Sequence, residues 1–172
     1  MVVYREIFEP APPRLDTRNM TEADLAMLRT AIALLFHFAR DEHDRVFTNL
    51  AGIVHCAEVC PSHAAACTGP HLDRWAAVTS APSEMNAIDL AILLRHEAEH
   101  IRLLPNGSHE YLPHTCRDGA CSDPWERFLD PIYRRDDEVR MILEAAVQRA
   151  RRQQAFQAMQ QYGQGFRGPP AY

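Results

Sequence analysis

The sequence predicts a mainly α-helical, compact domain with a short sheet or small β-hairpin and a long C-terminal helix. Apolar residues recur at helical spacing in several segments. Helix-start signals and prolines separate these segments from one another. The chain has 172 residues, of which 47% are apolar and 24% are charged. These values are typical of one soluble globular domain that is large enough to bury its own core.

The chain divides into three parts. Residues 1–20 contain three prolines and are expected to form an extended lead-in, with one short strand at Val2–Phe8. Residues 21–162 carry the helical patterns and are predicted to form a single domain. Residues 163–172 contain three glycines and two prolines, so we expect a flexible tail there.

The first half of the domain predicts two helices and a strand. Thr21 to Asp24 has the form of a capping box, which indicates a helix that runs to about Asp41. The segment Asp44–Cys60 is predicted to be a second helix, ended by Pro61. Residues 72–80 are expected to form a short strand or an extended run.

A third helix is predicted over Glu84–Leu104. Ser83 could cap its start, and no Gly or Pro interrupts it. Its apolar residues cover nearly the whole circumference, as expected of a helix that is packed on several sides. Pro105 and Gly107 end it.

Two further helices follow. The segment Ser122–Leu129 predicts a short one. Asp130 before Pro131 is a typical N-cap and first helical residue, and the helix from there is expected to reach about Gln161. One stripe of this last helix is apolar at helical spacing and comprises Ile132, Val139, Leu143, Ala146 and Ala150.

Charge and hydropathy exclude several classes of partner. The net charge of −5 argues against a nucleic-acid-binding surface. No apolar run is long enough to cross a bilayer. Residues 1–6 lack the basic start and apolar core of a secretory leader, so a cytoplasmic location is expected by default, with the compartment left open.

The five cysteines leave at least one thiol unpaired within the chain. Cys116 and Cys121 flank an Asp-Gly pair that indicates a tight turn, so they could bridge a small hairpin or remain free thiols. Residues 55–71 hold three Cys and three His. Their spacing matches no zinc-finger pattern, so we favour a loop with a disulfide or free thiols over a structural zinc site.

The most informative motif is His96-Glu97-x-x-His100. Residues four apart lie on one face of a helix, so both imidazoles could bind the same metal ion. Glu97 lies where its carboxylate could reach a water on that metal. Zinc needs neutral nitrogen ligands, an open coordination position and a base beside its water, and this motif supplies most of that set.

This motif and its helical context resemble the zincin metallopeptidases. The resemblance implies that His96 and His100 are zinc ligands and that Glu97 is the general base and acid. The metzincin branch is excluded, because it needs Gly and His where this chain has Leu103 and Asn106. The sequence therefore resembles a gluzincin-like zincin or a minimal variant in which an Asp is the third ligand.

A catalytic zinc usually has three protein ligands, so one more is required. The gluzincin pattern takes an acid from a later helix. In the helix from Pro131, Asp136 lies about 40° from Ile132 around the helix axis and is the acid nearest the apolar stripe. Asp136 is therefore the predicted third ligand, with Glu138 and His114 as alternatives.

The leading functional hypothesis is a zinc-dependent hydrolase, most simply a small metallopeptidase that acts on a peptide or protein substrate. A metal-bound water would be activated by Glu97, which would then protonate the leaving amine. A loop residue such as Tyr111 or His109 could stabilise the oxyanion.

The alternative is a non-catalytic structural or assembly protein with a degenerate or purely structural metal site. A protein partner could then bind through the C-terminal helix and tail. A di-iron carboxylate bundle ranks last, because it needs a second Glu-x-x-His that this chain lacks.

Overall fold

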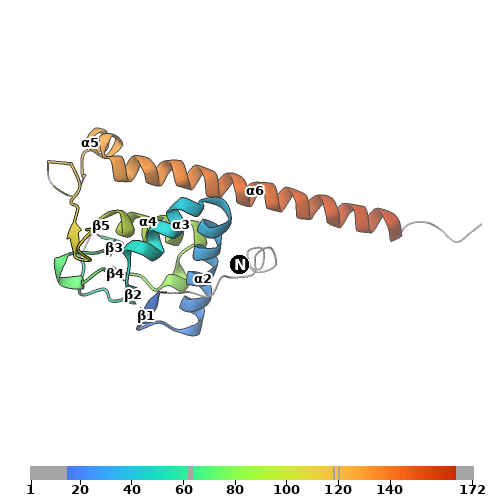
Figure 1. Ribbon diagram of the computed structural model, residues 1–172. Helices are drawn as coiled ribbons and strands as arrows, with labels where there is room; N and C mark the ends of the chain where they lie inside the picture. The colour runs from blue at the N-terminus through green and yellow to red at the C-terminus, as the bar shows by residue number, and fades with distance from the viewer. Residues whose placement is uncertain (1–14, 62–63, 118, 120, 166–172) are drawn as a thin grey trace, which may run out of the picture.

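The computed structural model describes residues 15–61, 64–117, 119 and 121–165. The predicted strand at Val2–Phe8 lies outside them. Shorter helices and a small sheet form one body, and a much longer helix runs along its outside and extends beyond it (Figure 1). The predicted mainly helical class, with a small sheet and a long C-terminal helix, is confirmed. The helices are α2 (Glu22–Phe38), α3 (Arg40–Asn49), α4 (Ala87–Glu99), α5 (Pro124–Leu129) and α6 (Pro131–Gly165).

Helix α2 begins at the predicted capping box. The hydroxyl of Thr21 accepts a hydrogen bond from the Asp24 backbone at 3.2 Å, and the Asp24 carboxylate accepts from the Thr21 backbone at 2.9 Å. Two orphan N–H groups are thereby satisfied. The helix ends at Phe38, slightly before the expected Asp41, and its inner face is fully buried in the core.

The predicted helix over Asp44–Cys60 is wrong beyond Asn49. Helix α3 ends there, and the chain enters strand β2 (Gly52–His55). A Cβ at Gly52 would lie 2.6 Å from the Trp75 ring and 2.8 Å from the Asp16 carbonyl oxygen. Only glycine fits between these neighbours, and both belong to the strands that flank β2.

The sheet has the strand order β1-β2-β4-β3. Strands β1 (Asp16–Arg18), β2 and β4 (Trp75–Val78) are parallel, whereas β3 (Ala66–Cys67) pairs antiparallel with β4. Strand β4 confirms the strand expected within residues 72–80. Because β3 is last in the order, its outer side is an edge of the sheet.

Helix α4 is shorter than the predicted Glu84–Leu104. The Asn86 side chain caps it by accepting from the Asp89 backbone at 2.9 Å. Ser83, the expected cap, instead lies within the short 3₁₀ turn η2 (Pro82–Glu84) and donates to Asp24 at 2.6 Å. The N-terminal boundary is therefore set by a tertiary contact of Ser83.

Tertiary contacts also end α4 at Glu99. The Asn49 side-chain amide donates to the carbonyl oxygens of Ala98 and Ile101. The chain then continues as strand β5 (Ile101–Leu103), which pairs with β6 (His109–Tyr111) in a two-stranded hairpin. This hairpin replaces the end of the predicted helix and part of the predicted loop.

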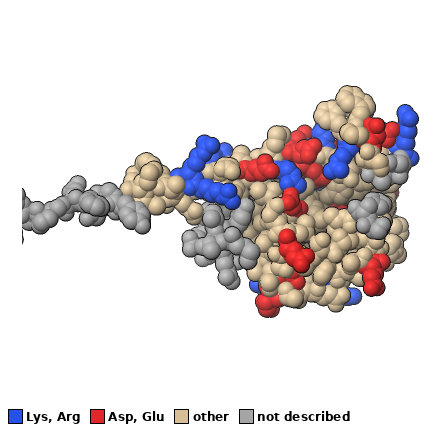
Figure 2. Space-filling view, turned by 180° about the vertical axis from the view of Figure 1, so that it is seen from behind, with Lys and Arg blue, Asp and Glu red and all other residues tan. Residues whose placement is uncertain are grey.

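Helix α6 starts where the sequence indicates. Asp130 accepts from the Ile132 backbone at 2.9 Å and so acts as the N-cap in front of Pro131. The first half of α6 packs on α4, and the second half stands clear of the body (Figure 1). Basic side chains gather where α6 leaves the body (Figure 2), a stretch with exposed arginines at positions 149, 151 and 152.

Four cysteines are paired. Disulfides join Cys60 to Cys67 and Cys116 to Cys121, and Cys56 is free. Both bridges agree with the disulfide interpretations of the two cysteine segments. Among the described residues, no helix combines the length and apolar character that a bilayer crossing needs.

Replacing Asp24 should destabilise the fold in a pH-dependent way. Its carboxylate accepts hydrogen bonds from the backbone and hydroxyl groups of Ser83 and Thr21, and these bonds hold its pKa well below the ordinary value. We expect Asp24→Ala to lower the free energy of unfolding at pH 7 by about 1–2 kcal/mol, as loss of a buried helix cap does.

The sign of the pH effect follows from the lowered native pKa. The stabilisation is present above about pH 4, the range of an unfolded aspartate, and is lost as the pH falls further. The stability gap between wild type and Asp24→Ala should therefore shrink from pH 7 to pH 3 in urea unfolding. Asp137→Asn, at an exposed position of α6, serves as control. A stability gap that does not change with pH would contradict the lowered pKa of Asp24 in the folded protein.

Candidate metal centre

Three histidine side chains converge at the C-terminal end of α4. One ring nitrogen from each of His96, His100 and His114 lies within 4.8 Å of the corresponding nitrogens of the other two. His100 is buried, whereas His96 and His114 are partly exposed. A single cation could therefore contact all three rings at a place that solvent reaches.

The end of α4 sets the relation between the first two rings. His96 lies in its last turn, and His100 is the C-cap with helical φ of −69° and ψ of −9°. The helical relation between residues four apart is thus retained. The two Nε2 atoms lie 3.3 Å apart, so both rings direct this nitrogen toward a common point.

The opposite nitrogen of each of these rings is held by an acceptor. Nδ1 of His96 lies 2.6 Å from Oδ2 of Asp136, and Nδ1 of His100 lies 2.6 Å from the carbonyl oxygen of Leu112. A carbonyl oxygen only accepts, so Nδ1 of His100 carries the proton and Nε2 keeps its lone pair. The Asp136 carboxylate favours the same tautomer of His96. Metal-bound histidines typically have such outer partners.

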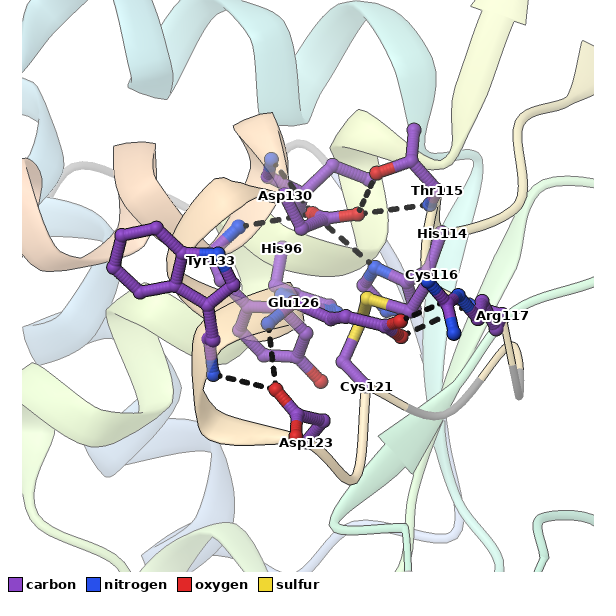
Figure 3. The surroundings of a disulfide bond; sticks show 12 residues. His96, His114, Thr115, Cys116, Arg117, Cys121, Asp123, Glu126, Asp130 and Tyr133 are labelled. Atoms are coloured by element: carbon purple, nitrogen blue, oxygen red, sulfur yellow. Dashed lines mark hydrogen bonds and ion pairs between the residues drawn. A yellow bond between two sulfur atoms is a disulfide. The ribbon is translucent and has the colours of Figure 1, made fainter.

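His114 comes from the segment that follows β6. Its Nδ1 lies 3.4 Å from Oδ1 of Asp130, and its ring stacks on Tyr133 with centroids 4.8 Å apart and planes 8° apart. Thr115 anchors the same segment, because its backbone N–H and hydroxyl both donate to Oδ2 of Asp130 (Figure 3). The ring is therefore held by its stacking on Tyr133 and by the anchored neighbour Thr115.

A disulfide closes the loop directly after His114. Cys116 and Cys121 are joined, and within the loop the Arg117 backbone donates to Glu126 of α5 at 3.1 Å (Figure 3). The chain cannot open at this point without breaking a covalent bond. The bridge restricts the freedom of the segment that carries His114.

A second group of three residues also has ligand atoms within 4.8 Å of one another, namely His114, Cys121 and Asp130. Its sulfur is part of the disulfide and has no thiolate to offer. The Asp130 oxygens already accept from Thr115 and from the first backbone N–H groups of α6. This group therefore serves to hold His114 in place.

Glu97 is a buried carboxyl beside the histidines. Burial raises its pKa to about 7, with a smaller contribution from Asp136, while His96 and a backbone hydrogen bond from Thr68 oppose the shift. A carboxyl with such a pKa can accept and release a proton near neutral pH. Its charge also adds to the burial that raises the pKa of the Tyr111 and Tyr133 phenols.

Burial has the opposite effect on the histidines. It lowers the pKa of His100 to about 4, and it lowers the pKa of His114 as well. Burial favours the neutral form of an imidazole. Both rings are therefore neutral at physiological pH, which is the state in which a nitrogen can bind a metal.

The predicted third ligand, Asp136, lies on the buried face of α6, as its helical phase indicates. One of its oxygens accepts from Arg95 at 2.6 Å and the other contacts His96. Among the described residues, the group with mutually close ligand atoms contains His114 in its place. The alternative Glu138 is largely exposed and pairs with Arg135.

The two predicted oxyanion donors lie on β6. The Tyr111 ring stacks on His100 with centroids 5.3 Å apart, which places it beside the centre. His109 pairs through its backbone with Leu103 in the hairpin. Tyr133, which the sequence did not single out, lies against His114 and near His96.

No protein-family model matches this chain, and neither a curated protein nor a solved structure matches it.

Removing the Cys116–Cys121 bridge should weaken metal binding. We expect Cys116→Ser with Cys121→Ser to lower zinc affinity about 10-fold, because ordering each released residue costs about 1–2 kcal/mol. Chelator competition measures this affinity. Cys60→Ser with Cys67→Ser removes a bridge that carries no histidine of the centre, so its affinity should stay near wild type. Equal losses in both variants would contradict a specific role of the first bridge.

Proposed function

We propose that this protein is a zinc-dependent hydrolase, most simply a small metallopeptidase, in which His96, His100 and His114 hold the metal. The observation that carries the proposal is the convergence of three ring nitrogens within 4.8 Å, next to a buried glutamic acid. Three protein nitrogens and one open position are typical of catalytic zinc. Neutral imidazoles suit zinc better than they suit magnesium or calcium.

In this proposal Asp136 is the outer partner of His96, and His114 is the third ligand. Both Asp136 oxygens are used by other groups, whereas one ring nitrogen of His114 lies within 4.8 Å of a ring nitrogen of His96 and of His100. His96 and His100 then each have an acceptor behind them, a carboxylate and a backbone carbonyl, and Nδ1 of His114 lies 3.4 Å from the Asp130 carboxylate. Such acceptors fix the tautomer and raise the basicity of the ligand.

Zinc bound at this centre would lower the pKa of a coordinated water and polarise the scissile carbonyl group. Glu97 is the group that moves the proton. Its buried carboxylate takes a proton from the attacking water and delivers it to the leaving amine. The burial of Glu97 beside the histidines supports both roles. Tyr111 and Tyr133 lie beside the centre, where a phenol could donate to the developing oxyanion.

The edge of the sheet favours a peptide as substrate. Strand β3 is last in the sheet order, and the backbone of Thr68, directly after it, lies close enough to Glu97 to oppose the rise in its pKa. The edge strand therefore ends next to Glu97, the proposed general base. An extended peptide can add to such an edge through main-chain hydrogen bonds, which places a peptide bond at the base.

A non-catalytic assembly role is the second candidate, and the exposed apolar side chains of α6 favour it. Phe156 and Met159 are 57% and 66% exposed on the part of α6 that stands clear of the body. A partner protein could cover them. The metal centre would then stabilise the fold without turnover.

Glu97→Gln separates the two candidates. The amide cannot take the proton, so we expect turnover of an unstructured protein substrate to fall at least about 100-fold. Zinc content should stay at wild-type level, because Glu97 is not a ligand. Glu138→Gln, an exposed glutamate on α6, is the matched control. Zinc-loaded wild type without hydrolysis of any peptide in a mixed library would favour the assembly role.

Ligand substitutions separate His114 from Asp136. Loss of an outer partner typically costs about 10- to 100-fold in metal affinity, and loss of a ligand should cost more. We therefore expect His114→Ala to weaken zinc binding well beyond Asp136→Ala in chelator competition. His109→Ala, a histidine of the neighbouring strand, should leave affinity unchanged. The reverse order of the first two variants would restore Asp136 as the ligand.

A further inference from the structure

Arg95, the residue directly before His96, is a buried guanidinium with an unusual number of partners. Only 1% of the residue is exposed. It donates to Glu42 Oε2 at 3.1 Å, the Ile132 carbonyl oxygen at 2.9 Å, Asp136 Oδ1 at 2.6 Å and Glu99 Oε2 at 3.0 Å. These acceptors come from α3, α4 and α6, so the guanidinium joins three helices at one point.

The Asp136 carboxylate is shared between this arginine and the metal centre. Its Oδ1 accepts from Arg95, and its Oδ2 lies 2.6 Å from Nδ1 of His96. A carboxylate held at one oxygen by a guanidinium keeps the direction of its other oxygen. The position of Arg95 therefore determines where His96 finds its acceptor.

Arg95 is itself held from the opposite side. Glu42 is buried and accepts from Nε of Arg95 with one oxygen and from Arg135 at 2.8 Å with the other. The Ile132 carbonyl fixes the Nη1 atom that also binds Asp136. A planar group anchored at Nε and at Nη1 has no remaining rotation.

We propose that Arg95 is a positioning residue of the metal centre: it fixes the Asp136 carboxylate so that His96 keeps its Nδ1–H toward that carboxylate and its Nε2 toward the metal. The inference rests on the proposed metal site and adds to it a residue that touches no ligand atom. This role distinguishes Arg95 from a residue that only forms an ion pair between helices. Buried ion pairs often contribute little to stability, so a purely stabilising role would leave this arrangement without a clear advantage.

Arg95→Lys tests the geometry of the guanidinium while keeping the positive charge. An ammonium group lacks the planar fork and cannot bind Glu42, Ile132 and Asp136 in the same arrangement. We expect Arg95→Lys to weaken zinc binding about 10-fold or more, the range of a lost outer partner. The absorption spectrum of the cobalt-substituted protein should also change, because the direction of the His96 ring changes. Circular dichroism of the metal-free protein checks that the fold is kept.

Arg140→Lys is the matched control. Arg140 also joins α6 to α4, through Asp89, but neither residue contacts the histidines. Zinc affinity and the cobalt spectrum should equal those of wild type. A loss of affinity in this variant equal to that in Arg95→Lys would show that helix packing alone is responsible and would overturn the proposal.

A double-mutant cycle shows whether Arg95 acts through Asp136. In the Asp136→Ala background, Arg95→Lys should change zinc affinity by less than about 2-fold, because the carboxylate that it positions is gone. Losses that multiply would overturn the proposal, as would wild-type affinity and an unchanged spectrum in folded Arg95→Lys. If Arg95→Lys does not fold, Glu42→Gln releases the other side of the guanidinium and should weaken zinc binding in the same direction. Unchanged affinity there would equally overturn the proposal.

Failure of the metal site gives a different result. Wild-type protein that binds neither zinc nor cobalt would remove the proposed function and this inference together. Wild-type protein that binds zinc, with variants at position 95 that bind equally well, would remove only the role of Arg95.

Discussion

The Asp136 carboxylate is the contact on which both the packing of the helices and the arrangement of the histidines depend. It lies on α6, yet both of its oxygens bind consecutive residues of α4, Arg95 and His96. A shift of α6 along α4 would break both contacts together. The register between these two helices is therefore coupled to the orientation of one ring of the proposed centre.

The buried charges around this carboxylate are costly to keep. Glu42, Arg95 and Asp136 are all buried, and removing such groups from water carries a large desolvation penalty that pairing only partly offsets. Apolar residues of similar size at these positions could stabilise the helix contact as well or better. What they could not supply is a fixed acceptor for an imidazole. The network is thus better explained by orientation than by stability.

The sequence predicts the locally determined parts of this molecule. The Thr21 capping box, the start of α6 and the burial of Asp136 each follow from neighbours within a few residues, and all are found. Strand β2 was missed because the reason for Gly52 lies in Trp75, which is distant in sequence. The place of His114 depends on Asp130 and on a disulfide turn, so no spacing rule connects it to the motif on α4. From the sequence, His114 is therefore only an alternative to Asp136 as the third ligand.

Glu97 gives the strongest physical reason to prefer catalysis to a structural role. Only 5% of this residue is exposed, and no Arg or His nitrogen of the described chain lies within ion-pair distance of its carboxylate. A buried carboxyl without such a partner destabilises the fold, and the raised pKa of Glu97 reflects this penalty. A structural zinc site would gain stability from an apolar residue here. A hydrolase instead needs a carboxyl beside the metal to exchange a proton with the attacking water and the leaving amine, and Glu97 lies buried beside the histidines.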